Sequence, residues 1–179
     1  MLIRKMKEHE IEFVRMQRLE GYKEYRSLVS EDHWYALKGT LSSDSDLNKG
    51  VEIFVAEIEN QLAGSIVLFP GKMASYEWTS DSPDYPEIRM LAVDHQYRGH
   101  GIGRALVQHC IDLSAKQGYS FVGLHTADFM KNAIALYTKM NFERVPEFDF
   151  EPVNDGIIVK GFRLPIPLLH PLKNKSQIE

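Results

Sequence analysis

The sequence predicts a single α/β (α+β) domain of about seven strands and four helices. Short runs of β-branched and aromatic residues alternate with longer stretches in which apolar residues recur at helical spacing. Turn-forming residues separate these segments, and no internal repeat or linker divides them. A length of 179 residues, with 44% hydrophobic and 26% charged residues, suits one globular domain with a sizeable core. We expect the domain to span 1–165, with 166–179 as a partly disordered tail.

The first half of the chain reads as one strand, two helices and a hairpin. Ser30, followed by acidic residues, is typical of a helix N-cap. The expected elements are a strand at 1–5, a helix at 11–22, a helix after Ser30, a loop at 42–50 and paired strands at 51–58 and 62–69.

The second half is predicted to contain four strands and two helices. They are strands at 87–93, 119–126, 142–150 and 157–164, a helix that begins at Ile102, and a helix at 128–140. In the strand at 87–93, strict alternation would put Glu87, Arg89, Leu91 and Val93 on one face and Ile88, Met90 and Ala92 on the other.

A glycine-rich turn at 98–104 joins the strand at 87–93 to the next helix. The first N–H groups of a helix lack intrahelical partners and lie at the positive end of its dipole, so they suit an anion. Arg98 and Arg104 flank the turn and could add charge-assisted hydrogen bonds to a phosphate. The spacing fits neither a Walker A loop nor a dinucleotide fingerprint, whose third glycine would fall on Arg104 or Leu106.

The turn instead matches the pattern [Q/R]-x-x-G-x-[G/A], read as Arg98-x-x-Gly101-x-Gly103. Glu87–Val93 precedes it and Asn132–Phe142 follows it, so that over residues 87–145 the chain resembles the GNAT superfamily of acyl-CoA-dependent N-acetyltransferases. The resemblance implies a three-layer fold with a mixed, mostly antiparallel sheet.

Two positions depart from the family pattern. Asn141 replaces a glycine before Phe142, which is a mild change because asparagine tolerates the left-handed conformation of a helix C-cap. His95 stands where many members have proline.

The resemblance implies acetyl-CoA as a co-substrate, with its pyrophosphate on the glycine turn and its pantetheine arm paired to the strand main chain. The cofactor-binding residues that it implies are Leu91, Ala92, Val93, Arg98, Gly99, His100, Gly101, Ile102, Gly103, Arg104 and Asn132. Asn132 could instead cap a helix. No cluster of His, Cys and carboxylates has metal-ligand spacing, so no metal is expected.

The resemblance also assigns two catalytic residues. Tyr137 would donate a proton or hydrogen bond to the departing thiolate, whose thiol has a pKa of about 8.5. Glu87 would take a proton from the amine, directly or through water. The alternatives are core packing for Tyr137 and a structural ion pair with Arg89 or Lys72 for Glu87.

Several classes of partner are disfavoured. A net charge of −4 argues against nucleic acid, and no apolar run approaches the roughly 20 residues that span a bilayer. The single cysteine, Cys110, excludes an internal disulfide, and the N-terminal sequence lacks a signal-peptide pattern, which favours the cytoplasm.

The amine acceptor is left open: a small amine is favoured, and a protein lysine or N-terminus is an alternative. Residues 70–86 combine acidic and aromatic side chains that could attract an ammonium group or could simply seal the core edge. A homodimer is also open. The rival function is a non-catalytic sensor that binds acyl-CoA.

Overall fold

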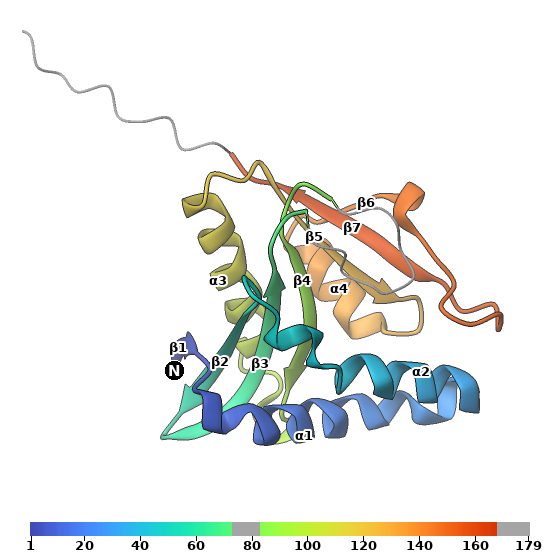
Figure 1. The fold of residues 1–179 in the computed structure, drawn as a ribbon, viewed down its shortest axis with the longest axis horizontal. Coiled ribbons are helices and arrows are strands. Elements are labelled where there is room, and N and C mark those ends of the chain that lie inside the picture. Colours follow the sequence, from blue (N-terminus) through green and yellow to red (C-terminus); the bar gives the residue numbers. More distant parts are fainter. Residues whose placement is uncertain (73–82, 168–179) are drawn as a thin grey trace, which may run out of the picture.

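The computed structural model describes residues 1–72 and 83–167, which form a seven-stranded mixed sheet and four α-helices (Figure 1). The strands are β1 (Leu2–Lys5), β2 (Glu52–Ile58), β3 (Gln61–Phe69), β4 (Glu87–Val93), β5 (Phe121–Ala127), β6 (Glu143–Arg144) and β7 (Val159–Pro165). The helices are α1 (Ile11–Tyr22), α2 (Glu31–Leu41), α3 (Ile102–Lys116) and α4 (Lys131–Lys139). The sheet order is β1-β2-β3-β4-β5-β7-β6, and the β4–β5 pair is parallel while the others are antiparallel. The predicted fold class is confirmed.

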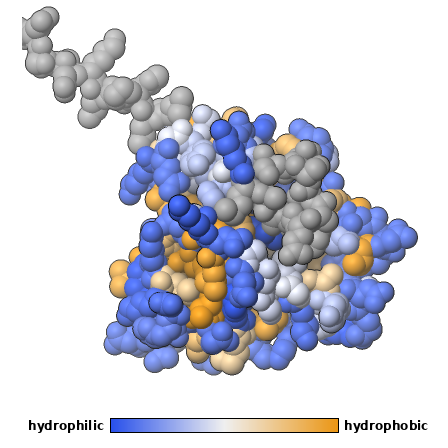
Figure 2. All heavy atoms as spheres, viewed as in Figure 1, coloured by the Kyte–Doolittle hydropathy of each residue, from blue (hydrophilic) through white to orange (hydrophobic). Residues whose placement is uncertain are grey.

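Two hydrophobic cores lie on opposite faces of this sheet and make three layers (Figure 1). The α3/α4 core includes Leu106, Cys110 and Tyr137. The α1/α2 core includes Val14 and Leu41, packed against β2, β3 and β4. Hydrophilic side chains cover most of the face seen in Figure 2, and apolar ones gather in a patch above α1.

A β-bulge at Met90 overturns the predicted alternation along β4. Met90 has a φ of 54°, and the register between β3 and β4 shifts beside it. One extra residue moves every later side chain to the other face. Glu87 and Arg89 therefore face the α1/α2 core together with Met90, whereas Leu91 and Val93 pack against the α3/α4 core.

Strand β4 separates from β5 soon after the two begin. Their paired residues are Glu87 with Gly123 and Ile88 with Leu124, near the start of both strands. Beyond this point the strands diverge, and the main chain of β4 faces a space that β5 does not fill. The split is the feature of the fold that positions the functional site.

The predicted strand at 142–150 is wrong in detail. Only the two residues of β6 pair as a strand there; a 3₁₀ turn, η5 (Pro146–Phe148), follows, and Phe150 makes an isolated bridge to Val159. Proline has no N–H to give to a ladder, so Pro146 starts a turn instead of continuing the strand.

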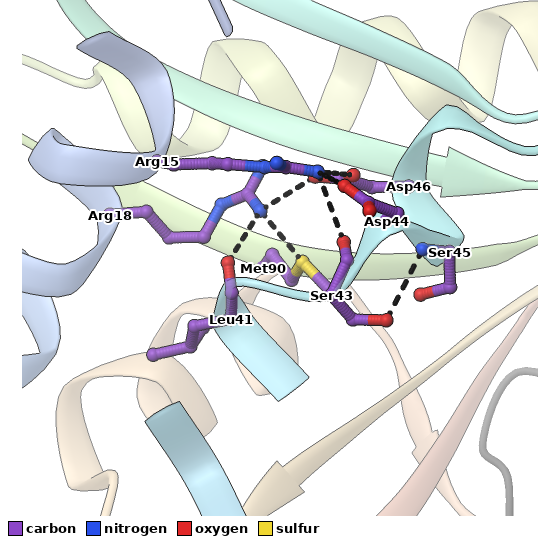
Figure 3. Close-up of polar contacts among 8 residues, drawn as sticks. All are labelled: Arg15, Arg18, Leu41, Ser43, Asp44, Ser45, Asp46 and Met90. Carbon is purple, nitrogen blue, oxygen red and sulfur yellow. Dashed lines mark hydrogen bonds and ion pairs between the residues drawn. The ribbon is translucent and has the colours of Figure 1, made fainter. Parts of the chain in front are cut away.

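A buried ion-pair network joins the α1/α2 layer to the sheet (Figure 3). The side chain of Arg18 is fully buried, and its Nη1 donates to Asp46 Oδ2 at 3.0 Å and to the Leu41 carbonyl at 3.1 Å. The Met90 sulfur lies 3.0 Å from the same nitrogen, and Arg15 Nη2 donates to Asp46 Oδ1 at 2.8 Å. Asp46 belongs to a 3₁₀ turn, η3 (Asp44–Leu47), within the stretch that was predicted to be an irregular loop.

Candidate functional site

A cavity of about 490 Å³ opens where β4 and β5 part. One wall comes from α1, α2 and the 3₁₀ turn η2 (Lys23–Leu28), and the other from β5, α3 and α4. The predicted site residues in its lining are Leu91, Ala92, Val93, Arg98, Gly99, Gly101, Ile102, Gly103, Arg104, Asn132 and Tyr137. Two predicted residues, Glu87 and His100, are outside the lining.

The glycine turn has the backbone that the sequence suggested. Gly99 and Gly101 have φ values of 81° and 77°, and Gly101 is the N-cap of α3. A Cβ added at either would meet no atom within 4 Å, so backbone conformation, not lack of space, requires glycine. The N-terminus of the 15-residue helix α3 thus faces the cavity, with Gly101 and Gly103 in the lining.

The basic residues of the turn have different surroundings. Arg98 donates from Nη1 to a Glu24 carboxylate oxygen at 2.8 Å and from Nε to the Val93 carbonyl at 3.2 Å, so it bridges η2 and the end of β4. Arg104 is exposed at the cavity edge. His100 points Nδ1 at the Arg98 carbonyl, 2.9 Å away, instead of into the cavity.

Tyr137 projects from α4 into the cavity wall. It is 6% exposed, and its ring meets Phe142 edge-on with centroids 5.8 Å apart. This packing holds the Tyr137 ring in one position, and the residue still lines the cavity. Asn132, in the first turn of α4, is exposed and lines the cavity, and the N-cap of that helix is Met130.

Glu87 is buried and paired with a residue that the sequence analysis did not single out. Its Oε1 lies 3.0 Å from Nδ1 of His125 on β5, and the Glu87 side chain is 4% exposed. His125 lines the cavity, so Glu87 lies behind it. An ion pair with Arg89 or Lys72 was the alternative that the sequence offered for Glu87, and His125 was not considered. The pairing was not visible in sequence because it depends on which residue of β5 lies beside the start of β4.

The second ring nitrogen of His125 fixes where the protons are. Nε2 lies 3.0 Å from the carbonyl oxygen of Phe148, which can only accept, so Nε2 carries a hydrogen. Glu87 and Nδ1 must then share a further proton. Burial alone lowers the pKa of His125, but the hydrogen bond and charge of Glu87 outweigh it and raise that pKa above its ordinary value.

Aromatic rings from α1, η2, α2 and the segment before α4 line one part of the cavity. We call this region, formed by Tyr22, Tyr25, His33 and Phe129, the aromatic end. Ring centroids are 6.1 Å apart for Tyr22–Tyr25, 5.3 Å for Tyr25–Phe129 and 6.1 Å for His33–Phe129. His33 is held by Asp155, whose Oδ2 lies 2.9 Å from its Nδ1.

Arg89 lines the cavity beside the aromatic end. It is 7% exposed, and its guanidinium carbon lies 4.8 Å from the ring centroid of Phe69. Its positive charge helps to lower the pKa values of both Tyr22 and His125, so it lies near both groups. In the stretch 70–86, which could attract an ammonium group or seal the core edge, residues 73–82, with Tyr76, Glu77, Trp78 and Asp81, lie outside the described residues.

Residues 10–142 match the Acetyltransferase (GNAT) family. The chain belongs to this family. A structure of a putative acetyltransferase from Salmonella typhimurium, solved with its cofactor acetyl-CoA, has the same fold as this GNAT chain, with a TM-score of 0.64 and 16% identity over 93% of this chain and 94% of that one.

Two curated relatives share more sequence with this GNAT chain. Human (Homo sapiens) N-acetyltransferase 8B is 32% identical over 101 residues, which are 54% of this chain and 40% of that protein. The [ribosomal protein bS18]-alanine N-acetyltransferase of Escherichia coli (strain K12) is 36% identical over 87 residues, 48% of this chain and 59% of that protein. The matches thus span less than two thirds of the length of these relatives.

The described residues lack both a metal-binding cluster and a membrane-spanning helix. Within 1–72 and 83–167, no three His, Cys, Asp or Glu side chains are grouped so as to hold a metal ion. Over the same ranges, no helix combines the length and apolarity needed to cross a membrane.

Proposed function

We propose that this GNAT chain transfers an acetyl group from acetyl-CoA to a primary amine, directly and in a ternary complex. One observation carries the proposal: a single cavity brings together the N-terminus of α3, the split edge of β4 and the hydroxyl-bearing ring of Tyr137. These are an anion site, an amide-pairing edge and a proton donor, which are the parts that thioester aminolysis needs.

The residues fit the cofactor in chemistry and in order. N–H groups at the start of α3 would hold the pyrophosphate, with Arg104 adding charge at the edge. The part of β4 that has diverged from β5 contains Leu91, Ala92 and Val93. Its main chain would pair with the amides of the pantetheine arm. The Salmonella typhimurium structure, which holds acetyl-CoA in the same fold, supports acetyl-CoA as the co-substrate.

The transfer itself forms a C–N bond and breaks the C–S bond of the thioester. A main-chain N–H near the end of β4 would polarise the carbonyl oxygen, and the Tyr137 hydroxyl would donate to the departing sulfur. The amine must lose a proton to react. We propose that Glu87 accepts this proton through a bridging water molecule, because Glu87 lies behind His125 and not in the cavity lining.

The variant Tyr137→Phe tests the chemical assignment. It removes one hydroxyl and keeps the ring packed on Phe142, so transfer should slow by about 100-fold while acetyl-CoA affinity is unchanged. Tyr119→Phe, outside the lining, is the matched control and should react at the native rate. An unaltered rate for Tyr137→Phe would remove Tyr137 from the mechanism.

Two measurements separate the enzyme from a sensor. Acetyl-CoA that binds only the folded chain raises its unfolding free energy by about 2.7 kcal/mol at a hundredfold excess over the dissociation constant. Free-thiol release is then followed with small amines, lysine peptides and a peptide with N-terminal alanine. The last is included because a ribosomal-protein alanine acetyltransferase is among the relatives. Stabilisation without thiol release from any amine would favour the sensor.

A further inference from the structure

The loop at 151–158, which leads into β7, is tied to the start of α2 across the split in the sheet (Figure 1). Oδ2 of Asp155 lies 2.9 Å from Nδ1 of His33 and accepts from the Ser30 hydroxyl at 3.2 Å. Ser30 is the N-cap of α2, whereas β7 pairs with β5 on the other side of the split. The tie therefore holds together the two parts of the molecule between which the cavity opens.

Asp155 makes this tie as an ionised carboxylate. Burial alone raises its pKa, but hydrogen bonds from the Ile157 N–H, at 3.1 Å, and from His33 outweigh burial and lower that pKa. An ionised carboxylate can only accept, so Nδ1 of His33 donates. His33 is 4% exposed, and its ring meets that of Phe129 with centroids 6.1 Å apart. The tie thus fixes one ring of the aromatic end.

Apolar side chains adjoin the rings of the aromatic end. The elements that carry these rings and the 151–158 loop add to the cavity lining Ala36, Leu37, Met130 and Pro152. Ala36 and Leu37 follow His33 by three and four residues, which places them on the same face of α2. An apolar group on a ligand gains free energy when it leaves water for such a place, and the rings add a preference for a flat partner.

The acid in this lining already has a cationic partner. Among the described residues that line the cavity, the carboxylate is that of Glu24, and it accepts from Nη1 of Arg98 at 2.8 Å. A second ammonium group on the acceptor would have to compete with Arg98 for this carboxylate and would lose its hydration among apolar side chains. The lining therefore favours a monoamine.

The aromatic end begins close to the edge of β4, along which the cofactor would lie. A Cβ added at Gly21, which precedes Tyr22, would be 3.8 Å from Cβ of Ala92. The cavity of about 490 Å³ must hold the thioester end of acetyl-CoA as well as the acceptor, and this volume suits a small molecule better than a peptide. An amine that attacks the thioester there would extend its other end among the rings.

We propose that the acceptor is a small monoamine with an apolar group, preferably an aromatic ring, and that this group binds in the aromatic end. Asp155 is a positioning residue, which acts through His33 to hold the 151–158 loop and the rings around that group. The inference rests on the proposed acetyl transfer. It excludes polyamines and peptide N-termini as preferred acceptors.

The first test compares phenethylamine, butylamine and 1,4-diaminobutane with the native protein and saturating acetyl-CoA, each rate being corrected for the fraction of neutral amine. Relative to butylamine, we expect kcat/KM to be about 10-fold higher for phenethylamine, which buries a ring, and about 10-fold lower for 1,4-diaminobutane, which must bury a charge. A diamine as good as butylamine, or no gain from the ring, would overturn the inference and leave the acetyltransferase standing. Failure to acetylate any amine would overturn both.

The second test separates a small acceptor from a peptide. L-phenylalaninamide and a tetrapeptide that begins with phenylalanine present the same side chain beside similar amines. We expect kcat/KM to be about 10-fold higher for the amide, because the rest of the peptide does not fit in the closed cavity. Equal or faster transfer to the peptide would overturn the proposal of a small acceptor.

The third test uses Phe129→Leu, which removes the central ring of the aromatic end and keeps an apolar side chain. The preference for phenethylamine over butylamine should fall by about 5-fold, while stabilisation by acetyl-CoA stays at its native value. Phe121→Leu is the matched control, because Phe121 lies outside the cavity lining, and it should keep the native preference. An equal loss for both amines in Phe129→Leu would show a merely structural role.

The fourth test releases the tie. In Asp155→Ala we expect KM for phenethylamine to rise by about 10-fold with kcat little changed and acetyl-CoA binding retained. Asn154→Ala, at the exposed neighbour in the same loop and outside the lining, should keep the native KM. An unchanged KM in Asp155→Ala would remove Asp155 from acceptor binding. If a variant does not fold, the comparison of acceptors with the native protein still decides.

Discussion

At the scale of single residues, the Glu87–His125 pair is the most constrained feature of the site. The Phe148 carbonyl commits Nε2 to a hydrogen, so the pair is either imidazolium with carboxylate or imidazole with carboxylic acid. Without the shared proton, the Nδ1 lone pair of His125 and the Glu87 carboxylate would repel each other at 3.0 Å, away from solvent. The folded state therefore holds this proton more tightly than the unfolded chain does.

This predicts a pH-dependent contribution to stability. The pKa of His125 is raised in the folded state, so the contribution is fully present below the unfolded value of about 6.5 and is lost as the pH rises through the raised pKa. The native protein's advantage over His125→Gln in unfolding free energy should therefore shrink from pH 6 to pH 9. Urea unfolding at each pH measures it.

His109 provides a control of opposite sign. Burial lowers the pKa of His109, whose ring packs against Phe54 with centroids 4.5 Å apart. Its contribution is present above the unfolded pKa and is lost as the pH falls, so the advantage over His109→Gln should grow with rising pH. Slopes of the same sign for the two variants would contradict the proton assignment at His125.

The site residues that were predicted from sequence are the ones that local patterns single out. The glycine turn, Tyr137 and Glu87 stand at fixed spacings in one stretch of chain, and the structure brings the turn and Tyr137 to one cavity with Glu87 just behind it. The places of His125 and Arg89 in the cavity lining were not predicted. Their surroundings depend on strand register and on contacts with α1, which no local pattern encodes.

At the scale of elements, the turn before α3 joins backbone conformation to ligand binding. Gly101 has a left-handed φ of 77° and caps the helix whose N-terminus faces the cavity. We expect Gly101→Leu to weaken acetyl-CoA binding by at least about 10-fold, because the new side chain would occupy the approach to the N–H groups and strain the cap. Calorimetric titration with acetyl-CoA measures the loss.

Gly118 is the matched control for this change. It has a φ of 83° at the opposite end of α3, and a Cβ there would also meet no atom within 4 Å. Gly118→Leu should cost similar stability and leave acetyl-CoA affinity unchanged. Native affinity in Gly101→Leu would mean that the turn does not hold the pyrophosphate.

Elements with strong periodicity were predicted closely, and irregular ones were not. The bounds of β4 match the predicted 87–93, and α1 covers the stretch in which apolar residues from Ile11 to Tyr22 indicated a helix. The bulge at Met90 was missed because a positive φ in an apolar strand has no sequence signature when the residue is not glycine. The strand at 142–150 failed at Pro146, where a missing N–H outweighs the alternating pattern.

At the scale of the whole molecule, the shape of the cavity depends on how the α1/α2 layer is positioned over the split between β4 and β5. The buried Arg18–Asp46 pair fixes this position, because the fully buried Arg18 side chain contacts the end of α2, the turn η3 and the bulge of β4. Burial lowers the pKa of Arg18 even with Asp46 beside it, which indicates how poorly this place accommodates an uncompensated charge.

Asp46→Asn should therefore destabilise the protein by about 3–5 kcal/mol, since it keeps the shape of the side chain and leaves the Arg18 charge buried without a counter-charge. Asp44→Asn is the control: Asp44 contacts the same Arg15 nitrogen, but its side chain is 87% exposed, so its loss should cost no more than about 1 kcal/mol. Urea unfolding of the two variants gives both values.

Replacing both partners, in Arg18→Met with Asp46→Leu, should recover most of the lost stability, because two apolar side chains leave no charge to solvate. If Asp46→Asn were as mild as Asp44→Asn, the α1/α2 layer would be held by its apolar contacts with the sheet, and the network would contribute alignment without stability.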